Sequence, residues 1–351
     1  MLMMVDFART VAVFGAYGHT GRFVVAELID RGYVPLLVGR DESKLQQLAS
    51  TYPQLITRTA SADDPASLDQ AFADAAAVIN CAGPFASTGI PVIEAALRAG
   101  IPYVDVAAEI EANVDTFAQF AERARAADVA VVPAMAFFGG LGDLLATAAV
   151  SDDGWTSVDE VHVAYGLSSW HPTAGTQAAG TVSHQRRAGQ RVRFTEGALT
   201  YYDAAGDLEL QEWPFPVPTG PRKVLAEFTM ADVVTIPSHL SVREVRNYMA
   251  VEAADDLAAP NAAAPTAVDE RGRSAQTFVV DVVVRRGDQE RRALASGQDI
   301  YAISAPLAVE AVHRILTGRT KISGVASAGE IFDAPDFLRS LAPHLVFERR
   351  D

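Results

Sequence analysis

The sequence predicts an α/β protein: a Rossmann-type doubly wound parallel sheet and a second α+β domain built on a mixed or antiparallel sheet. Three observations predict this fold. An apolar run at residues 11–14 leads into glycines at 15, 18 and 21 and then into an amphipathic helix pattern. Strand and helix patterns alternate from there to Pro133, which is typical of a parallel sheet. Later in the chain, two strand-like runs flank Arg286-Gly287-Asp288, which indicates a β-hairpin.

The glycine loop at residues 15–21 has the position of a dinucleotide-binding turn. Gly15 permits a tight turn after the strand, Gly18 lets the backbone approach a pyrophosphate, and Gly21 lets the helix pack closely on the strand. The free N–H groups at the helix N-terminus then face the phosphates. The spacing is Gly-x-x-Gly-x-x-Gly, slightly longer than Gly-x-Gly-x-x-Gly. The loop residues expected to bind the cofactor are Gly15, Tyr17, Gly18, His19, Thr20 and Gly21.

The end of the second predicted strand, at residues 34–38, indicates which dinucleotide binds. NAD-preferring folds usually carry an acidic residue there, which binds the ribose 2′-hydroxyl. This chain has Gly39 followed by Arg40, whose guanidinium can pair with a 2′-phosphate and stack on adenine. Ser43 and Lys44 lie one helical turn further on and can add donors. We therefore expect NADP. NAD stays open because Asp41 can bind a ribose hydroxyl, and Arg40 and Lys44 can also be ordinary surface charges.

The strand predicted at residues 76–81 runs into the turn Ala82-Gly83-Pro84-Phe85. In doubly wound sheets the ligand crevice lies at the carboxyl ends of the strands, so this turn is expected to border the nicotinamide half of the cofactor. Cys81 is expected to be a small buried residue inside the strand rather than a nucleophile.

Length and composition limit the classes of function. The 351 residues suggest two domains, and 49% hydrophobic residues suffice for a large core. A formal net charge of −15 argues against nucleic acid as a partner. A single cysteine, an N-terminus without a signal-peptide pattern and the lack of a long unbroken apolar segment favour a cytoplasmic protein with no membrane span. No grouping has metal-ligand spacing, so no metal is expected.

Several motifs resemble those of the saccharopine dehydrogenase (reductase)-like oxidoreductases: the glycine loop, Gly39-Arg40, Asn80-Cys81-Ala82-Gly83-Pro84-Phe85, Tyr103-Val104-Asp105, and the runs at 297–302 and 329–332. The resemblance implies a Rossmann domain of residues 1–133. Residues 297–351 would complete that domain after a substrate-binding and oligomerisation domain of residues 134–296. It also implies nicotinamide-dependent chemistry, often at a C=N bond. Some members are trans-acting reductases of carrier-bound enoyl chains.

The second domain offers three candidates for catalysis: Asp143, Tyr165 and His171. Asp143 follows a glycine-rich loop, where the resemblance implies a substrate-contacting or proton-relay group, and the alternative is a helix cap. Tyr165 lies on a predicted strand and either donates a phenolic proton or packs in the sheet. His171, like His184 further on, is either a proton donor or a surface residue.

Other local predictions in this half concern four segments. We expect a long polar loop at 168–180, a short helix at 181–187, helical spacing at 242–254, and a helix at 305–316 that begins near Pro306. A basic cluster either binds a substrate carboxylate, a phosphate or a carrier arm, or forms a solvated face. Its members are Arg186, Arg187, Arg191 and Arg193.

Together these features predict an NADP(H)-dependent oxidoreductase that transfers a hydride to or from a C=N or C=C bond of a small-molecule substrate. Two alternatives stay open. One is a non-catalytic NADP-binding sensor or partner protein, and the other is a trans-acting enoyl reductase whose acyl chain is bound to a carrier protein. By analogy, the sheet of the second domain is a candidate face for a homodimer.

Overall fold

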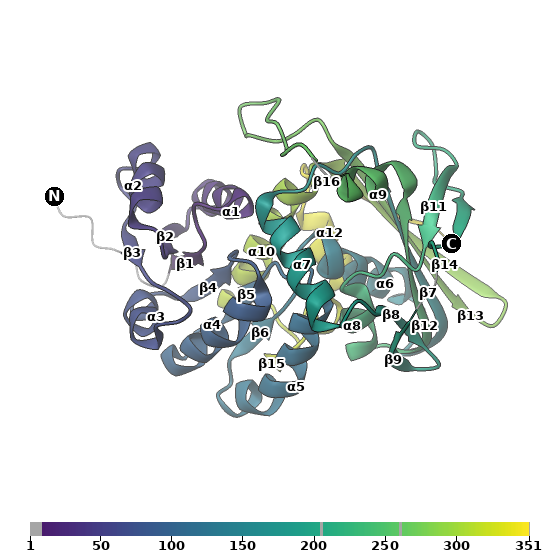
Figure 1. The fold of residues 1–351 in the computed structure, drawn as a ribbon. Coiled ribbons are helices and arrows are strands. Elements are labelled where there is room, and N and C mark those ends of the chain that lie inside the picture. The colour runs from purple at the N-terminus through teal and green to yellow at the C-terminus, as the bar shows by residue number, and fades with distance from the viewer. Residues whose placement is uncertain (1–8, 204–205, 260–261, 351) are drawn as a thin grey trace.

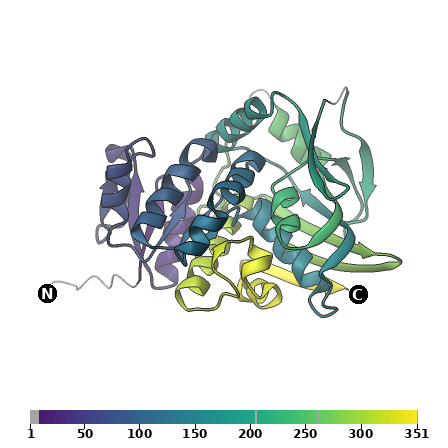
Figure 2. The same cartoon turned by 90° about the horizontal axis from the view of Figure 1, so that it is seen from below.

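The computed structural model describes residues 9–203, 206–259 and 262–350. Two β-sheets lie at opposite ends of the molecule, with helices around and between them (Figures 1 and 2). Residues 1–8 and 351 lie outside the described ranges. The prediction that the N-terminus is not a signal peptide, and the outer limits of the predicted first domain, concern these residues.

The first sheet has seven parallel strands in the order β15-β6-β5-β4-β1-β2-β3. β1 pairs with β2 on one side and with β4 on the other, so the direction of winding reverses beside β1. In doubly wound sheets this reversal opens a crevice at the carboxyl ends of the strands. The strands are β1 (Thr10–Phe14), β2 (Val34–Gly39), β3 (Thr57–Thr59), β4 (Ala77–Asn80), β5 (Tyr103–Asp105), β6 (Ala130–Val132) and β15 (Gly324–Val325).

Helices cover both faces of this sheet because the side chains of its strands alternate. In β1, Val11 and Val13 share a buried cluster with residues of α1 and α2, whereas Ala12 and Phe14 share one with residues of α3, α4 and α5. The helices are α1 (His19–Asp30), α2 (Glu42–Thr51), α3 (Pro65–Phe72), α4 (Phe85–Ala99) and α5 (Ile110–Ala126).

The second sheet has nine strands. Seven follow the order β10-β11-β12-β7-β13-β14-β16, and a hairpin of β8 and β9 joins it through β12. β7 and β12 are parallel, while the other pairs are antiparallel, so the sheet is mixed. The predicted fold class is confirmed. The strands are β7 (Ser157–Leu167), β8 (Arg191–Thr195), β9 (Ala198–Tyr202), β10 (Leu210–Trp213), β11 (Arg222–Ala226), β12 (Ser241–Ala250), β13 (Thr277–Arg286), β14 (Gln289–Gln298) and β16 (Leu345–Arg350).

One continuous hydrophobic core joins the two sheets. It contains Val13 of β1, Leu144 of α6, Leu307 of α10 and Val163 of β7. Helix α7 lies between the two sheets (Figure 1). The helices of this part are α6 (Gly142–Val150), α7 (Ala174–Arg186), α8 (Asp232–Thr235), α9 (Val251–Ala258), α10 (Ile300–Leu316), α11 (Ala328–Ile331) and α12 (Ala334–Ser340), with a π-helical turn at Phe137–Leu141 and a 3₁₀ turn at Ile236–Ser238.

The C-terminal part of the chain contributes to both sheets. β15 pairs with β6 in the parallel sheet, whereas β16 pairs with β14 in the mixed sheet. Figure 2 shows the C-terminal segment, in yellow, extending from the parallel sheet to the mixed sheet. The predicted domain limits stay a prediction.

The predicted loop at 168–180 is wrong beyond Thr173. Helix α7 begins at Ala174, because the Thr173 hydroxyl accepts a hydrogen bond from the backbone N–H of Thr176 (3.1 Å) and caps the helix. Ser183 is the buried residue of α7. The helix therefore has no apolar stripe that the sequence could reveal.

Two other local predictions are also wrong. Residues 241–250 form strand β12 instead of a helix, because pairing with β7 and β11 outweighs the local spacing. Helix α10 begins at Ile300 instead of near Pro306. The side chain of Asp299, at a φ of 61°, accepts hydrogen bonds from Tyr301 N (2.9 Å) and Ala302 N (3.0 Å) and so caps the helix one and a half turns earlier.

Candidate functional site

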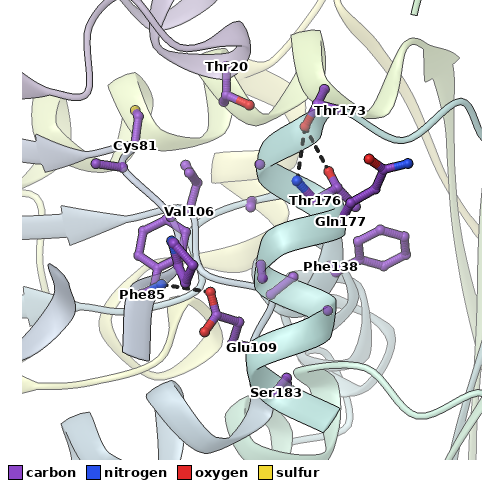
Figure 3. Close-up of a pocket in the computed structure, with 18 of the residues that line it drawn as sticks. Thr20, Cys81, Phe85, Val106, Glu109, Phe138, Thr173, Thr176, Gln177 and Ser183 are labelled. Carbon is purple, nitrogen blue, oxygen red and sulfur yellow. Dashed lines mark hydrogen bonds between the residues drawn. The ribbon is translucent and has the colours of Figure 1, made fainter. Parts of the chain in front are cut away.

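A cavity of about 1610 Å³ opens at the carboxyl ends of β1, β2 and β4. One wall consists of the glycine loop, the end of β2 and the turn after β4. The opposite wall consists of α7 and of residues 228–230, which follow β11 (Figure 3). The cavity therefore lies where the winding of the parallel sheet reverses, with part of the second domain over it.

The glycine loop is packed so closely that side chains would not fit. A Cβ at Gly15, whose φ is 85°, would lie 2.9 Å from the Cβ of Ala82, and one at Gly18 would lie 3.1 Å from the carbonyl oxygen of Gly15. A Cβ at Gly21 would overlap that same oxygen and lie 2.9 Å from the carbonyl oxygen of Ala16. The loop thus brings its backbone to the start of α1, which has no side-chain cap. These features fit a diphosphate bound by main-chain N–H groups.

His19 adds a polar atom to this loop. Its Nε2 is buried and has no hydrogen-bond partner among the described residues. Burial lowers the pKa of the imidazole, although Asp299 opposes this shift. The ring lies edge-on to Tyr301, with 5.1 Å between ring centroids. An unpartnered buried nitrogen that lines the cavity is available to a bound group.

The end of β2 carries the residues expected at the 2′-position. The ring of Tyr17 lies over Gly39, where a Cβ would come within 2.6 Å of it, and the Lys44 ammonium lies 5.7 Å from the ring centroid. Arg40 lines the cavity, is exposed, and makes no ion pair within the described ranges. Asp41 instead caps α2, and the hydrogen bond from Ser43 Oγ (2.7 Å), followed by that from Lys44 N (3.1 Å), lowers its pKa.

The turn after β4 is fixed from two sides. Asn80 Oδ1 accepts a hydrogen bond from Ala82 N (3.0 Å). Directly before α5, in the loop that follows β5, Glu109 accepts hydrogen bonds from Phe85 N (2.6 Å) and from Ala86 N (3.1 Å), the first residues of α4 (Figure 3). Burial raises the pKa of the Glu109 carboxyl, and the two N–H groups oppose that rise.

Cys81 lies one residue past β4 and lines the cavity, so its predicted position inside the strand is wrong. The strand ends at Asn80, whose side chain turns the backbone toward Ala82. Burial raises the pKa of the thiol well above its usual value. The raised pKa favours the protonated thiol, which is a poor nucleophile. Cys81 is half-buried instead of buried as expected, and its lack of a nucleophilic role stays a prediction.

Helix α7 covers the cavity and is tied at both ends. At its start, the Tyr301 hydroxyl bonds with Thr176 Oγ1 (2.9 Å) and accepts from Trp170 Nε1 (3.2 Å). At its end, the Ser183 hydroxyl donates to Glu111. Between these ties, α7 presents hydroxyl and amide groups to the cavity (Figure 3). Apolar side chains complete this wall: Phe138, Trp170, Phe228, Met230 and Leu257.

Comparison with known proteins identifies the nucleotide-binding half. The family model of the saccharopine dehydrogenase NADP binding domain matches residues 11–132. Residues 11–132 therefore resemble the NADP binding domain of saccharopine dehydrogenases. The chain is also similar to the saccharopine dehydrogenase-like oxidoreductase of Mus musculus, 30% identical over 145 residues that cover 36% of this chain and 34% of that protein.

A relative from Arabidopsis thaliana is 30% identical over 142 residues, which cover 36% of this chain and 31% of that protein. The matched segments thus span about a third of the length of these relatives. The Arabidopsis protein carries the name "Probable mitochondrial saccharopine dehydrogenase-like oxidoreductase". The cytoplasmic location of this chain stays a prediction.

The whole fold is similar to that of apo histidine-tagged saccharopine dehydrogenase (L-Glu forming) from Saccharomyces cerevisiae. The TM-score is 0.65 at 11% sequence identity, covering 98% of this chain and 100% of that chain. The likeness therefore extends through the second sheet, beyond the segment that the family model matches.

Most residues predicted to bind the cofactor line the cavity beside the NADP-binding domain. They are Gly15, Tyr17, Gly18, His19, Thr20, Arg40, Lys44, Ala82, Gly83, Pro84 and Phe85. Two do not line it. Gly21 packs against the loop backbone, and the Ser43 hydroxyl is bonded to Asp41. Their predicted direct contacts with the cofactor are therefore not supported by their positions.

The three predicted catalytic residues do not line the cavity. Asp143 is fully buried and accepts hydrogen bonds from Gly329 N (2.7 Å) and His239 Nε2 (2.7 Å). Tyr165 is also fully buried, and its hydroxyl donates to Asp232 (2.6 Å). His171 is exposed outside the cavity. Asp143 and Tyr165 already have hydrogen-bond partners in the core, and His171 lies outside the cavity. We therefore propose none of the three as the proton donor.

Sequence reasoning missed Glu109 as a site residue and also missed Asp232. The position of Glu109 after β5, on the same edge as the glycine loop, was the available signal. In the basic cluster, Arg187 and Arg191 line the cavity, whereas Arg186 pairs with Asp115 (2.7 Å).

Within the described residues, no three His, Cys, Asp or Glu side chains are placed to hold a metal ion. Within the same ranges, no helix has the length and hydropathy to cross a bilayer.

The buried Asp232 makes stability depend on pH. Its Oδ2 accepts from Tyr165 (2.6 Å) and Asn247 (3.0 Å), while Oδ1 has no partner among the described residues. Burial raises the pKa of this carboxyl to about 7. An unfolded carboxyl titrates near about 3.9. Between these two values the folded state holds the proton more strongly, so this group makes the protein less stable as pH rises.

Asp232→Asn keeps an acceptor oxygen for Tyr165 and Asn247 but cannot ionise. We expect the variant to be as stable as the wild type at pH 4 and more stable at pH 8, by at most about 4 kcal/mol. Urea unfolding of both proteins across this range measures the difference. A difference that stays constant with pH would show that Asp232 does not titrate in this way.

Proposed function

We propose that the chain is an NADP(H)-dependent oxidoreductase that transfers a hydride to or from a C=N or C=C bond of a small molecule. One observation carries this proposal. The glycine loop, Arg40 and the turn at 82–85 line a single cavity, and the same cavity extends to an apolar wall under α7. Its volume of about 1610 Å³ exceeds the roughly 300–1,000 Å³ of usual small-molecule sites. The cavity thus has room for a substrate beside a cofactor.

The residues have distinct roles in this proposal. Backbone N–H groups of the glycine loop bind the diphosphate, and Arg40 with Lys44 binds the 2′-phosphate. The turn at 82–85 orients the nicotinamide, which supplies the hydride chemistry when bound. Helix α7 and Phe138 exclude water and hold the substrate against the turn.

The experiment has two stages. Titration calorimetry with NADP⁺ and NADPH tests binding, and NADPH oxidation is then followed with panels of imines, enoyl thioesters and carbonyl compounds. Turnover of an imine or enoyl compound supports the proposal, and absence of binding contradicts it. Binding without turnover favours a non-catalytic NADP-binding protein. Turnover only of carrier-bound enoyl thioesters favours a trans-acting enoyl reductase. A homodimer, a carrier-protein partner and a cytoplasmic location stay predictions.

Arg40 is expected to select NADP over NAD. Arg40→Ala removes an exposed guanidinium that has no ion pair within the described ranges, so the folded protein loses little. Because a hydrogen bond to a charged group contributes about 1.5–3 kcal/mol, NADP⁺ affinity should fall about tenfold or more while NAD⁺ affinity stays nearly constant. Arg98→Ala, which removes an equal charge from a surface pair with Asp69, is the control and should change neither affinity. Equal losses for both dinucleotides would contradict the assignment.

A further inference from the structure

We propose that Glu109 exchanges the proton that accompanies hydride transfer, as general acid in reduction and general base in oxidation. This inference rests on the proposed function. Glu109 lines the cavity next to the turn that is expected to border the nicotinamide (Figure 3). The carboxyl group therefore lies where a substrate carbon or nitrogen would react.

The geometry leaves the carboxylate able to act. Oε1 and Oε2 accept one backbone N–H each, from Phe85 and Ala86, so each oxygen keeps a further lone pair. Within the described residues, Glu109 makes no ion pair that would fix its charge. The two N–H groups also hold the carboxyl in one orientation against the first turn of α4, which a general acid requires.

Of the described carboxylates that line the cavity, Glu109 is the one that contacts the turn at 82–85. Among the described residues that line the cavity, the other carboxylates are Asp63 and Glu227. Asp63 follows β3, beyond the strand whose end carries Arg40, and Glu227 follows β11 in the second domain. Neither adjoins the turn at 82–85.

The charges around Glu109 favour a retained proton. Asp105 at the end of β5 and Glu111 on α5 raise its pKa further, after the larger effect of burial. From α7, Arg187 lies against Glu111 (3.5 Å) and so has a carboxylate partner of its own. His184, also on α7, lines the same cavity and is the alternative donor.

The step balances with the proposed cofactor. In reduction, a C–H bond would form at the substrate carbon with a hydride that bound NADPH would supply, leaving NADP⁺. The Glu109 O–H bond breaks, and its proton forms an N–H bond at an imine nitrogen or a C–H bond at the neighbouring carbon of an alkene. The carboxylate then takes up one proton from the solvent, so one hydride and one proton are consumed in each turnover. Oxidation is the reverse, with Glu109 as the base.

The first test needs no substrate. An ionised Glu109 attracts the positive nicotinamide ring of NADP⁺, whereas NADPH carries a neutral ring. We expect NADP⁺ affinity to fall about tenfold as pH falls through the Glu109 pKa, with little change for NADPH. Glu109→Gln should remove this dependence. Glu94→Gln in α4, the helix whose first N–H groups Glu109 binds, loses a charge paired with Arg123 and should keep the dependence.

The second test is kinetic, with a substrate found in the panels. We expect Glu109→Gln to lower kcat about 100-fold or more and to abolish the pH dependence that a single carboxyl imposes on kcat/KM, while Glu109→Asp restores part of both. Equal melting temperatures of the variants would show that α4 remains in place. NADP⁺ binding with the same pH dependence in Glu109→Gln, or a pH profile lost in His184→Asn instead, would overturn the inference. No dinucleotide binding by the wild type would instead contradict the proposed function.

Discussion

Gly21→Ala is expected to abolish measurable NADP(H) binding, although Gly21 does not line the cavity. The added Cβ would overlap the carbonyl oxygen of Gly15 and crowd that of Ala16. These are backbone atoms, so the helix α1 and the loop must move apart instead of a side chain rotating away. The diphosphate site needs both in their present places. We expect at least a 100-fold loss of affinity, measured by calorimetry.

A second glycine gives a matched control. Gly89 is also a buried helical glycine, in α4, but apart from its chain neighbours and the adjacent backbone of its own helix, no described residue has a heavy atom within 4 Å of its Cβ position. Gly89→Ala should therefore keep the affinity and gain up to about 1 kcal/mol of stability from helix propensity. If Gly21→Ala bound NADP⁺ as tightly as Gly89→Ala, close packing of the loop would not be needed for binding.

Glu310→Ala is expected to cause the largest loss of stability, about 3–5 kcal/mol. Glu310, in α10, accepts hydrogen bonds from Arg314 Nε (2.6 Å) and from Arg31, the residue that follows α1. Arg314 is only 1% exposed. Burial alone would raise the pKa of Glu310, but the two arginines lower it, so the carboxylate is ionised. Its removal leaves a buried guanidinium with Asp336 (2.9 Å) as its remaining ion-pair partner.

Urea unfolding measures this loss, and Glu94→Ala is the control. The Glu94–Arg123 pair joins two exposed side chains at 3.2 Å, and such pairs contribute about 0–1 kcal/mol. A Glu310→Ala variant that loses no more stability than Glu94→Ala would mean that the contact between α1 and α10 does not depend on this charge.

The nucleotide half could be predicted because its signals are local. Gly15, Gly18 and Gly21 lie within one strand–turn–helix unit, and Arg40 directly follows the next strand. Parallel strands bring such positions to one edge of the sheet whatever the rest of the chain does. That edge is where the cavity lies.

The catalytic half could not be predicted in this way, because burial depends on distant parts of the chain. Asp143 looked like a cleft residue after its glycine loop, yet its partners are Gly329 and His239. No sequence motif marks Glu109, because its partner Phe85, at the start of α4, lies 24 residues earlier in the chain. Helix α7 likewise begins at a single threonine cap in a segment of small and polar residues. Side-chain type and spacing therefore predicted the residues that line the candidate cofactor site, but not the polar groups on the rest of the cavity wall.

A crystal structure of the chain with NADP⁺ tests the central claim most directly. The account predicts the diphosphate on the N–H groups of the glycine loop, the 2′-phosphate on Arg40, and the nicotinamide ring between the turn at 82–85 and α7, beside Glu109. A dinucleotide bound outside this cavity, or bound in it with adenine beside Glu109, would contradict the account.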